Sequence, residues 1–208
     1  KKQKLDRDDI IDITDLDVVA WLKAEMRLML DEEIARAILV GDGREPDDED
    51  KIDEDHLRPI AFDVDMYAEK VNLASNATQV QVEDGILRAR SKYKGTGTPE
   101  MFCSLKTLNM FLKAKDGMQR RLYASKSEVA VALGGSDIVV VEIMNDYPEV
   151  VGIIVNLADY KVGTDKGGEV SQFDDFDIDY NKYKYLIEGR MSGALNKIKS
   201  ALVVKKTA

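Results

Sequence analysis

One long helix is the feature of this sequence that most restricts its fold. Residues 14–40 are rich in alanine, leucine, methionine, glutamate and arginine, which are good helix formers. Thr14 can cap the first turn, and Gly41 is placed to end the helix. At 1.5 Å per residue such a helix is roughly 40 Å long. That length is unusual for a compact domain in a chain of 208 residues.

The apolar residues of this helix form two stripes. At 100° per residue the first stripe holds Leu16, Val19, Met26, Leu30, Ile34 and Ala37. The second stripe lies well round the helix and holds Trp21, Leu28, Ala35 and Leu39. A helix on the outside of a domain needs only one apolar stripe, so two stripes predict contacts on two sides. Two interpretations are open: the helix is enclosed by its own fold, or the second stripe meets a missing segment or another subunit.

The negative charge is concentrated near the start of the chain. Residues 1–60 contain 10 Lys and Arg against 19 Asp and Glu, whereas residues 61–208 contain 20 of each. Residues 42–55 hold nine of these acids, and we interpret them as a solvated loop or linker. The formal charge of −9 argues against a general nucleic-acid-binding protein. No apolar run approaches the ~18 residues of a transmembrane helix, so we expect no membrane span.

From residue 57 onward, short strands and helices alternate. The periodicity predicts strands at 67–73, 101–104, 138–143, 150–155 and 200–204, and helices at 77–93, 105–115 and 126–133. Ser125 and Glu128 have the spacing of a capping box. The runs 138–143 and 150–155 are apolar and β-branched, which predicts strands buried on both faces. Residues 183–195 alternate at period two, which predicts a half-buried antiparallel strand.

The sequence contains no recognisable catalytic, cofactor-binding or metal-binding motif. His56 is the only histidine and follows the acidic stretch, so we expect an exposed side chain and not a catalytic or metal-binding one. Cys103 is the only cysteine, which excludes an internal disulfide and predicts a small core residue. The glycines lack the spacing of a dinucleotide or phosphate loop. We therefore predict a chain without catalytic apparatus, with a two-carboxylate hydrolase left as an open alternative.

Several segments resemble the major capsid proteins of tailed bacteriophages of the Hong Kong 97 type. Residues 13–44, from Ile13-Thr14-Asp15-Leu16 to Gly41-Asp42-Gly43-Arg44, are similar to the spine helix and following turn of that family. Residues 175–195 and 200–204 resemble its C-terminal strands, and Arg120-Arg121-Leu122-Tyr123 with residues 138–143 fits its axial lobe. The resemblance implies that this sequence corresponds to the C-terminal portion of such a protein, without the family's N-terminal arm and extended loop.

The resemblance implies an α+β fold with a peripheral lobe and an α/β axial lobe. Residues 1–60 would form the first part of the peripheral lobe, with the spine helix at 14–41 and the acidic loop at 42–55. Residues 61–164 would form the axial lobe. Residues 165–208 would supply antiparallel strands of the peripheral lobe, and the last strand would return to the axial lobe.

The function implied by the resemblance is structural. Copies would self-assemble as pentamers and hexamers into an icosahedral shell around double-stranded DNA, in the virion and, during assembly, in the host cytoplasm. Scaffold and portal proteins are further possible partners, and DNA is a partner only by enclosure. The resemblance implies no catalytic residue, cofactor, metal, membrane contact or small-molecule substrate.

Six residues are candidates for the subunit interface. They are the second stripe of the long helix and two tyrosines of the tail strand: Trp21, Leu28, Ala35, Leu39, Tyr183 and Tyr185. Two alternatives to a phage shell remain open at this point. One is an encapsulin-like compartment shell, and the other is an acidic α/β enzyme or ligand-binding domain.

Overall fold

The chain forms two compact units. The computed structural model describes the backbone of residues 2–6 and all of residues 18–165 and 170–207. Unit 1 comprises Lys1–Arg36 and Val162–Ser192, and unit 2 comprises Ala37–Lys161 and Gly193–Ala208. The chain passes between the units within helix α2 (Val18–Leu39) and within a two-stranded ribbon of β6 (Tyr160–Thr164) and β9 (Met191–Leu195).

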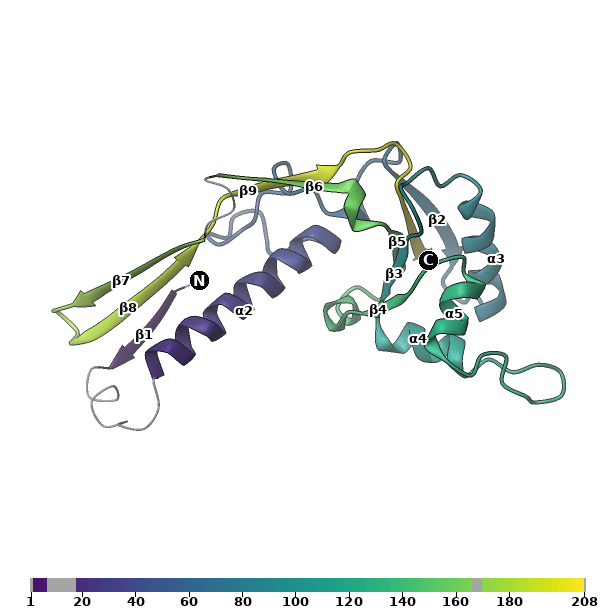
Figure 1. Ribbon diagram of the computed structural model, residues 1–208, viewed down its shortest axis with the longest axis horizontal. Coiled ribbons are helices and arrows are strands. Elements are labelled where there is room, and N and C mark those ends of the chain that lie inside the picture. The colour runs from purple at the N-terminus through teal and green to yellow at the C-terminus, as the bar shows by residue number, and fades with distance from the viewer. Residues whose placement is uncertain (1, 7–17, 166–169, 208) are drawn as a thin grey trace. The chain divides into compact units, whose positions relative to one another are not determined.

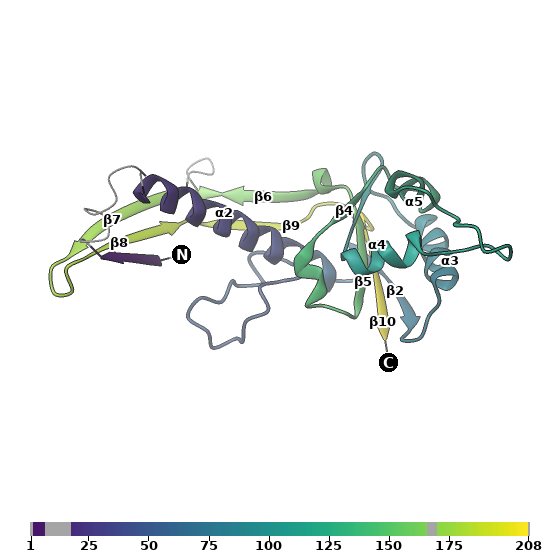
Figure 2. The same cartoon turned by 90° about the horizontal axis from the view of Figure 1, so that it is seen from below.

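Unit 1 is a three-stranded antiparallel sheet with α2 lying along it (Figures 1 and 2). The strand order is β1-β8-β7, where β1 is Lys2–Asp6, β7 is Ser171–Asp177 and β8 is Lys182–Glu188. Met26 of α2 is buried with Tyr185 and Ile187 of β8. Five partly buried side chains surround them: Val19, Leu22, Leu30, Val170 and Tyr183. Three residues of the first apolar stripe, Val19, Met26 and Leu30, thus lie on the side of α2 that meets the sheet, together with Leu22.

The end of α2 follows the sequence prediction. The helix has 22 residues and ends at Leu39. Gly41 then takes a positive φ of 85°, a conformation that glycine adopts without strain. The predicted cap at Thr14 and the stripe residue Leu16 lie outside the described residues.

Unit 2 is built on a mixed five-stranded sheet (Figure 1). The strands are β2 (Ala68–Ala74), β3 (Glu100–Cys103), β4 (Ile138–Val140), β5 (Val150–Val155) and β10 (Ala201–Thr207). The order is β2-β10-β5-β3-β4, with β10 parallel to β2 and antiparallel to β5, and β3 antiparallel to β5 and parallel to β4. The strand at 200–204 is thereby confirmed, and it lies inside the sheet.

Three helices cover one face of this sheet. They are α3 (Gln79–Arg90), α4 (Leu105–Leu112) and α5 (Lys126–Ala132), and their buried residues form one core with alternate strand residues. The other face meets the 3-10 turn η1 (Ile60–Phe62), in which Ile60 and Ala61 are fully buried. All six residues of β5 are buried, which confirms the predicted strand covered on both faces.

Two local predictions need correction, and two strands were not predicted. The predicted strand at 138–143 stops at Val140, where the chain turns into η2 (Glu142–Asn145). It was also predicted to be buried on both faces, but β4 is the outermost strand and only Ile138 is buried. The predicted single strand at 183–195 is interrupted at residues 189–190, so that β8 joins the sheet of unit 1 while β9 pairs with β6. The sequence patterns did not predict the strands β1 and β6. The turn η3 (Leu157–Asp159) leads into β6.

Residues 37–60 group with unit 2, although we expected them in the same lobe as the long helix. Two backbone hydrogen bonds hold the end of this segment in unit 2. The Gly193 amide donates to the His56 carbonyl, and the Arg58 amide donates to the Gly193 carbonyl, each at 2.8 Å. The adjoining η1 turn then enters the core, so this segment is an integral part of unit 2 and not a separate linker.

Candidate subunit-contact surfaces

The side chains with catalytic potential do not form a reactive site. His56 is exposed, and its Nδ1 lies 2.7 Å from an Asp53 carboxylate oxygen. The Asp55 amide and the His56 ring hold the pKa of Asp53 below its usual value. Cys103 is fully buried, which confirms it as a core residue, and burial raises the pKa of its thiol to about 12. Among residues 18–165 and 170–207, no three His, Cys, Asp or Glu side chains are grouped closely enough to hold a metal ion.

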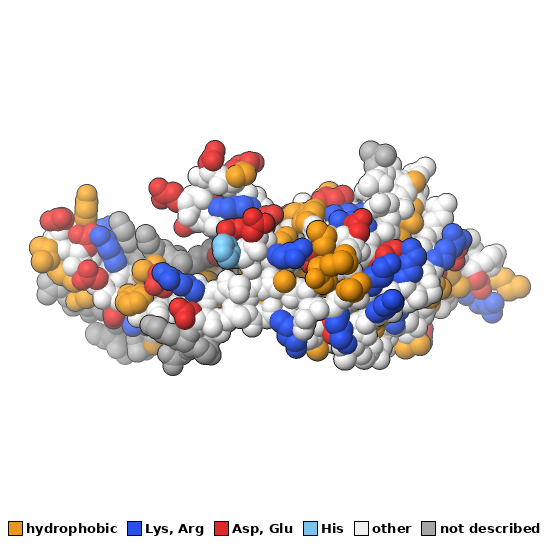
Figure 3. All heavy atoms as spheres, turned by 90° about the horizontal axis from the view of Figure 1, so that it is seen from above, with side chains coloured by type: hydrophobic (Ala, Val, Ile, Leu, Met, Phe, Trp, Pro, Cys, Tyr) orange, Lys and Arg blue, Asp and Glu red, His pale blue; other side chains and the backbone are white. Residues whose placement is uncertain are grey.

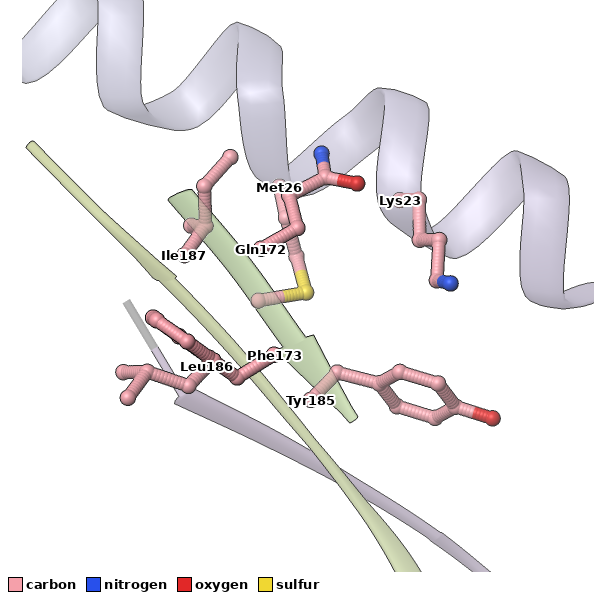
Figure 4. Close-up of a pocket in the computed structure, with 7 residues that line it drawn as sticks. All are labelled: Lys23, Met26, Gln172, Phe173, Tyr185, Leu186 and Ile187. Carbon is pink, nitrogen blue, oxygen red and sulfur yellow. The ribbon is translucent and has the colours of Figure 1, made fainter. Parts of the chain in front are cut away.

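The cavity beneath α2 in unit 1 is a packing gap. Its volume is about 10 Å³, roughly the space of one water molecule. Figure 4 shows Met26 pointing from α2 toward the sheet, near Ile187 and Tyr185. Lys23 lies at its edge, with Nζ 5.6 Å from the centre of the Tyr185 ring. The cavity is too small for a cofactor or an organic substrate.

The outer side of α2 carries an exposed apolar stripe. Trp21 is 57 % exposed and Leu28 is 53 % exposed, and Ala35 on the same stripe is exposed as well. Met26, nearly opposite on the helix, is 3 % exposed. Three of the four residues of this stripe are thus exposed in the part of the chain that the structure describes, so three of the six candidate interface residues are available for contact.

The other three candidates lie differently. Leu39 is buried in unit 2, and Tyr185 is buried under α2, where burial raises the pKa of its hydroxyl. Neither can reach a partner surface without rearrangement, because the chain's own side chains already cover them. Tyr183 is partly buried and packs on Phe176, with ring centres 5.0 Å apart.

Unit 1 has further exposed apolar residues outside the six interface candidates. Three belong to β7 and to the turn that joins it to β8: Phe173, Ile178 and Tyr180. The period-two pattern of the tail was the available signal, because it implies a second sheet face as well as the one under α2. Phe173 pairs with Leu186, whose neighbours Tyr185 and Ile187 point toward α2 (Figure 4).

Asp42 organises the acidic segment, which we define as residues 42–55. We expected the whole segment to be solvated, but the Asp42 side chain is only 1 % exposed. It accepts hydrogen bonds from Lys51 Nζ at 2.7 Å, the Ile52 amide at 2.6 Å and the Arg44 amide at 3.2 Å. Burial alone would raise the pKa of Asp42, but these hydrogen bonds outweigh it and hold the pKa below its usual value.

The rest of the acidic segment presents carboxylates to solvent. The following acids are exposed: Glu45, Asp47, Asp48, Glu49, Asp50, Asp53, Glu54 and Asp55. Figure 3 shows acidic side chains gathered beside His56, the pale blue side chain. Both cations of the segment are engaged within it, since Lys51 Nζ also lies 3.0 Å from Glu54 and Arg44 donates to the Asp50 carbonyl at 2.6 Å.

A second buried carboxylate, Asp159, fixes two loops of unit 2. It accepts hydrogen bonds from the Thr96 amide, at 2.5 Å, and from the Thr96 hydroxyl. Lys197 Nζ lies 3.7 Å from Asp159 and donates to the Thr96 hydroxyl at 2.6 Å. Burial would raise the pKa of Asp159, and the Thr96 hydrogen bonds together with Lys197 lower it overall. The cluster is a structural clamp, because its hydrogen bonds join Thr96, Asp159 and Lys197 of the same chain.

Comparison with solved structures identifies the fold. A chain from the capsid of an empty GTA particle, computed with C5 symmetry, matches 100 % of this chain and 72 % of its own length, with a TM-score of 0.72 and 17 % identity. A chain of Mycobacterium phage Bobi matches 100 % of this chain and 71 % of its own length, with a TM-score of 0.68 and 9 % identity. A chain of Microbacterium phage Oxtober96 also matches 100 % of this chain and 71 % of its own length, with a TM-score of 0.69 and 10 % identity.

These likenesses establish that the chain has the mixed helix-and-sheet fold of phage capsid proteins. No protein-family model matches the sequence. No curated protein matches it either. Within the residues that the structure describes, no helix has the length and hydropathy to cross a lipid bilayer.

Proposed function

We propose that this chain is the major capsid protein of a tailed bacteriophage or prophage, of the Hong Kong 97 type. Copies would assemble through pentamers and hexamers into an icosahedral shell that encloses double-stranded DNA. The observation that carries the proposal is the match of the whole chain to phage capsid chains, including one solved with five-fold symmetry. The role is structural, with the virion as its location and the host cytoplasm as the place of assembly.

The lobes of that fold can be assigned to the two units. We assign unit 1, with most of α2 and the β1-β8-β7 sheet, to the peripheral lobe. We assign unit 2 to the axial lobe that meets its copies around the five-fold and six-fold axes. Residues 37–60 then go with the axial lobe. Trp21, Leu28 and Ala35 become the contact stripe of the peripheral lobe.

Physical arguments support a structural role for such a chain. Closed symmetry repeats each contact many times, so individually weak contacts between copies suffice. An exposed tryptophan on a helix is costly for an isolated molecule and useful at an interface. The acidic segment would repel packaged DNA, so we expect it to avoid the surface that faces the interior.

Electron microscopy of the full-length gene product tests the proposal. We expect closed particles that contain DNA in the infected or induced host. Particles that enclose a protein cargo instead would favour the compartment-shell alternative. A protein that stays monomeric at every concentration and in its native host would contradict a shell role.

A further inference from the structure

A ring of identical copies needs two different surfaces on each copy. In a head-to-tail ring, one surface of a subunit meets a different, complementary surface of the next. Unit 2, which we assign to the rings, carries two surfaces of opposite charge. One is the exposed part of the acidic segment, and the other is a groove on α4.

The α4 groove is open and cationic at its rim. It is lined by Leu105, Lys106, Asn109, Met110, Lys113 and Asn145. Leu105 is 54 % exposed, so the groove also offers an apolar contact. Lys106 and Lys113 lie seven residues apart on α4 and its C-terminal cap, which places them on one side of the helix. Asn109, one turn from each, adds an amide between the two ammonium groups.

The two lysines are not neutralised within the described chain. Neither Lys106 nor Lys113 forms an ion pair among the described residues, and residues 104–115 contain no acid. Glu142 and Asp146 lie on or next to the turn η2 but do not line the groove, whose wall there is Asn145. The groove therefore has capacity for carboxylates that this copy does not fill.

The acidic segment has the complementary property. Its own cations are directed inward, at Asp42, Glu54 and the Asp50 carbonyl, so the carboxylates of residues 45–50 face outward uncompensated. Figures 1 and 2 show α4 and the loop that follows α2 at different places on unit 2. The Asp42 anchor keeps this loop in a defined conformation, which reduces the ordering needed for docking.

We propose that the α4 groove of one copy receives the acidic segment of the next copy. The inference rests on the proposed function, because it specifies the head-to-tail contact of the rings. Carboxylates of residues 45–50 would pair with Lys106 and Lys113, and the methylene groups of these side chains would lie on Leu105. The contact would weaken with salt, since exposed charge pairs are screened within about 10 Å at 0.1 M ionic strength.

A nucleic acid is the competing occupant of a cationic groove. Two lysines can neutralise only a few backbone phosphates, so they contribute little affinity for a nucleic acid. The apolar residues Leu105 and Met110 do not add to that affinity. An acidic segment on the same chain, present in equal number in every particle, fits the groove better.

Charge reversal tests the contact. The groove variant carries Lys106→Glu and Lys113→Glu, the segment variant carries Asp47→Lys and Asp48→Lys, and a third protein carries all four changes. Each two-residue variant should weaken the contact about tenfold, and the four-residue variant should recover it, because the charges again match. The control is Lys94→Glu with Lys161→Glu, which makes the same change of net charge at two exposed lysines of unit 2.

Zero-length carbodiimide crosslinking gives an independent readout. Isotopically light and heavy copies are mixed, assembled and crosslinked, and mass spectrometry identifies peptides that join two copies. We expect links from Lys106 or Lys113 to an acid of residues 45–50, and fewer such links in the segment variant, which keeps both lysines and the acids at positions 45, 49 and 50.

The outcomes separate this inference from the proposed function. Particles that form without these links, or a groove variant that assembles like the control, overturn the groove contact and leave the shell role intact. Links between copies in small oligomers only, with no particles, support the contact and count against the shell. A groove variant that assembles normally but loses DNA binding assigns the groove to nucleic acid and overturns the inference.

Discussion

The two units differ in how completely each one buries its own apolar residues. Among the described residues, sixteen buried side chains form one core in unit 2, where three helices and the η1 turn cover both faces of a sheet. Unit 1 has a core of three buried side chains beneath a single helix. Small units bury too little apolar surface to be stable alone. Unit 2 is therefore expected to fold by itself, whereas unit 1 should depend on additional contacts.

The largest effect is expected in the core of unit 2. Ile86→Ala should lower the free energy of unfolding by about 2–5 kcal/mol, because Ile86 is fully buried and its truncation leaves a cavity. Leu87→Ala is the matched control, since the next residue of α3 is 48 % exposed and should cost within about 0.5 kcal/mol. Denaturant unfolding measures both. Equal losses for the two variants would contradict the burial assigned to this helix.

A smaller effect is expected in unit 1. Met26→Ala should cost about 2 kcal/mol, at the lower end of the range for buried methionine, because a three-residue core can collapse around the gap. Hydrogen exchange should show faster exchange in β7 and β8 and unchanged protection in β5 and β10. Loss of protection in both units together would show that they unfold as one body.

The Asp42 anchor should make the acidic segment sensitive to acid. The pKa of Asp42 is lowered in the folded state, so its contribution is present above the unfolded value near 3.8 and is lost as pH falls through the lower folded value. Asp42→Asn should cost about 1–3 kcal/mol at neutral pH, because Lys51 then faces a neutral amide. Proteolysis of the segment at several pH values measures the effect. In the variant, cleavage should be fast at neutral pH and should change little on acidification.

The smallest effect on stability is expected at Trp21. Trp21→Asp should change the free energy of unfolding by about 0.5 kcal/mol or less, because the side chain is exposed, but it should strongly reduce particle formation. Trp21→Phe keeps an apolar ring and should still assemble. Sedimentation of assembled particles provides the measurement. A loss of stability as large as that expected for Met26→Ala would instead place Trp21 in the core of its own chain.

Residues with periodic or capping patterns could be predicted from sequence. The first stripe of α2 and the fully buried strand β5 follow from the spacing of apolar residues. The cap at Ser125 was also correct, since its hydroxyl accepts from the Glu128 amide at 3.3 Å. Glu128, however, accepts from Ala124 instead of the Ser125 amide. The complete capping box lies at Thr78 and Gln81, two residues that the sequence reading placed inside a longer helix.

Other features depended on contacts between distant segments. The sequence places Asp42 in an acidic run, and only folding brings Lys51 and the Ile52 amide to it. The break between β8 and β9 follows from their different partner strands, β7 and β6, and the local period-two pattern continues across it. For the candidate interface, Trp21 is exposed and its role stays a prediction, while the burial of Leu39 and Tyr185 depended on neighbours that a stripe does not reveal.

The place of β10 between β2 and β5 has a consequence for how the protein is made. The ribosome completes β2 and β5 long before it delivers residues 201–207, which pair with both. Until then the sheet lacks its inner strand β10, so the facing edges of β2 and β5 remain unpaired. The β7–β8 hairpin of unit 1 is synthesised in this interval. Unit 2 can thus complete its sheet only after residues 201–207 have emerged from the ribosome.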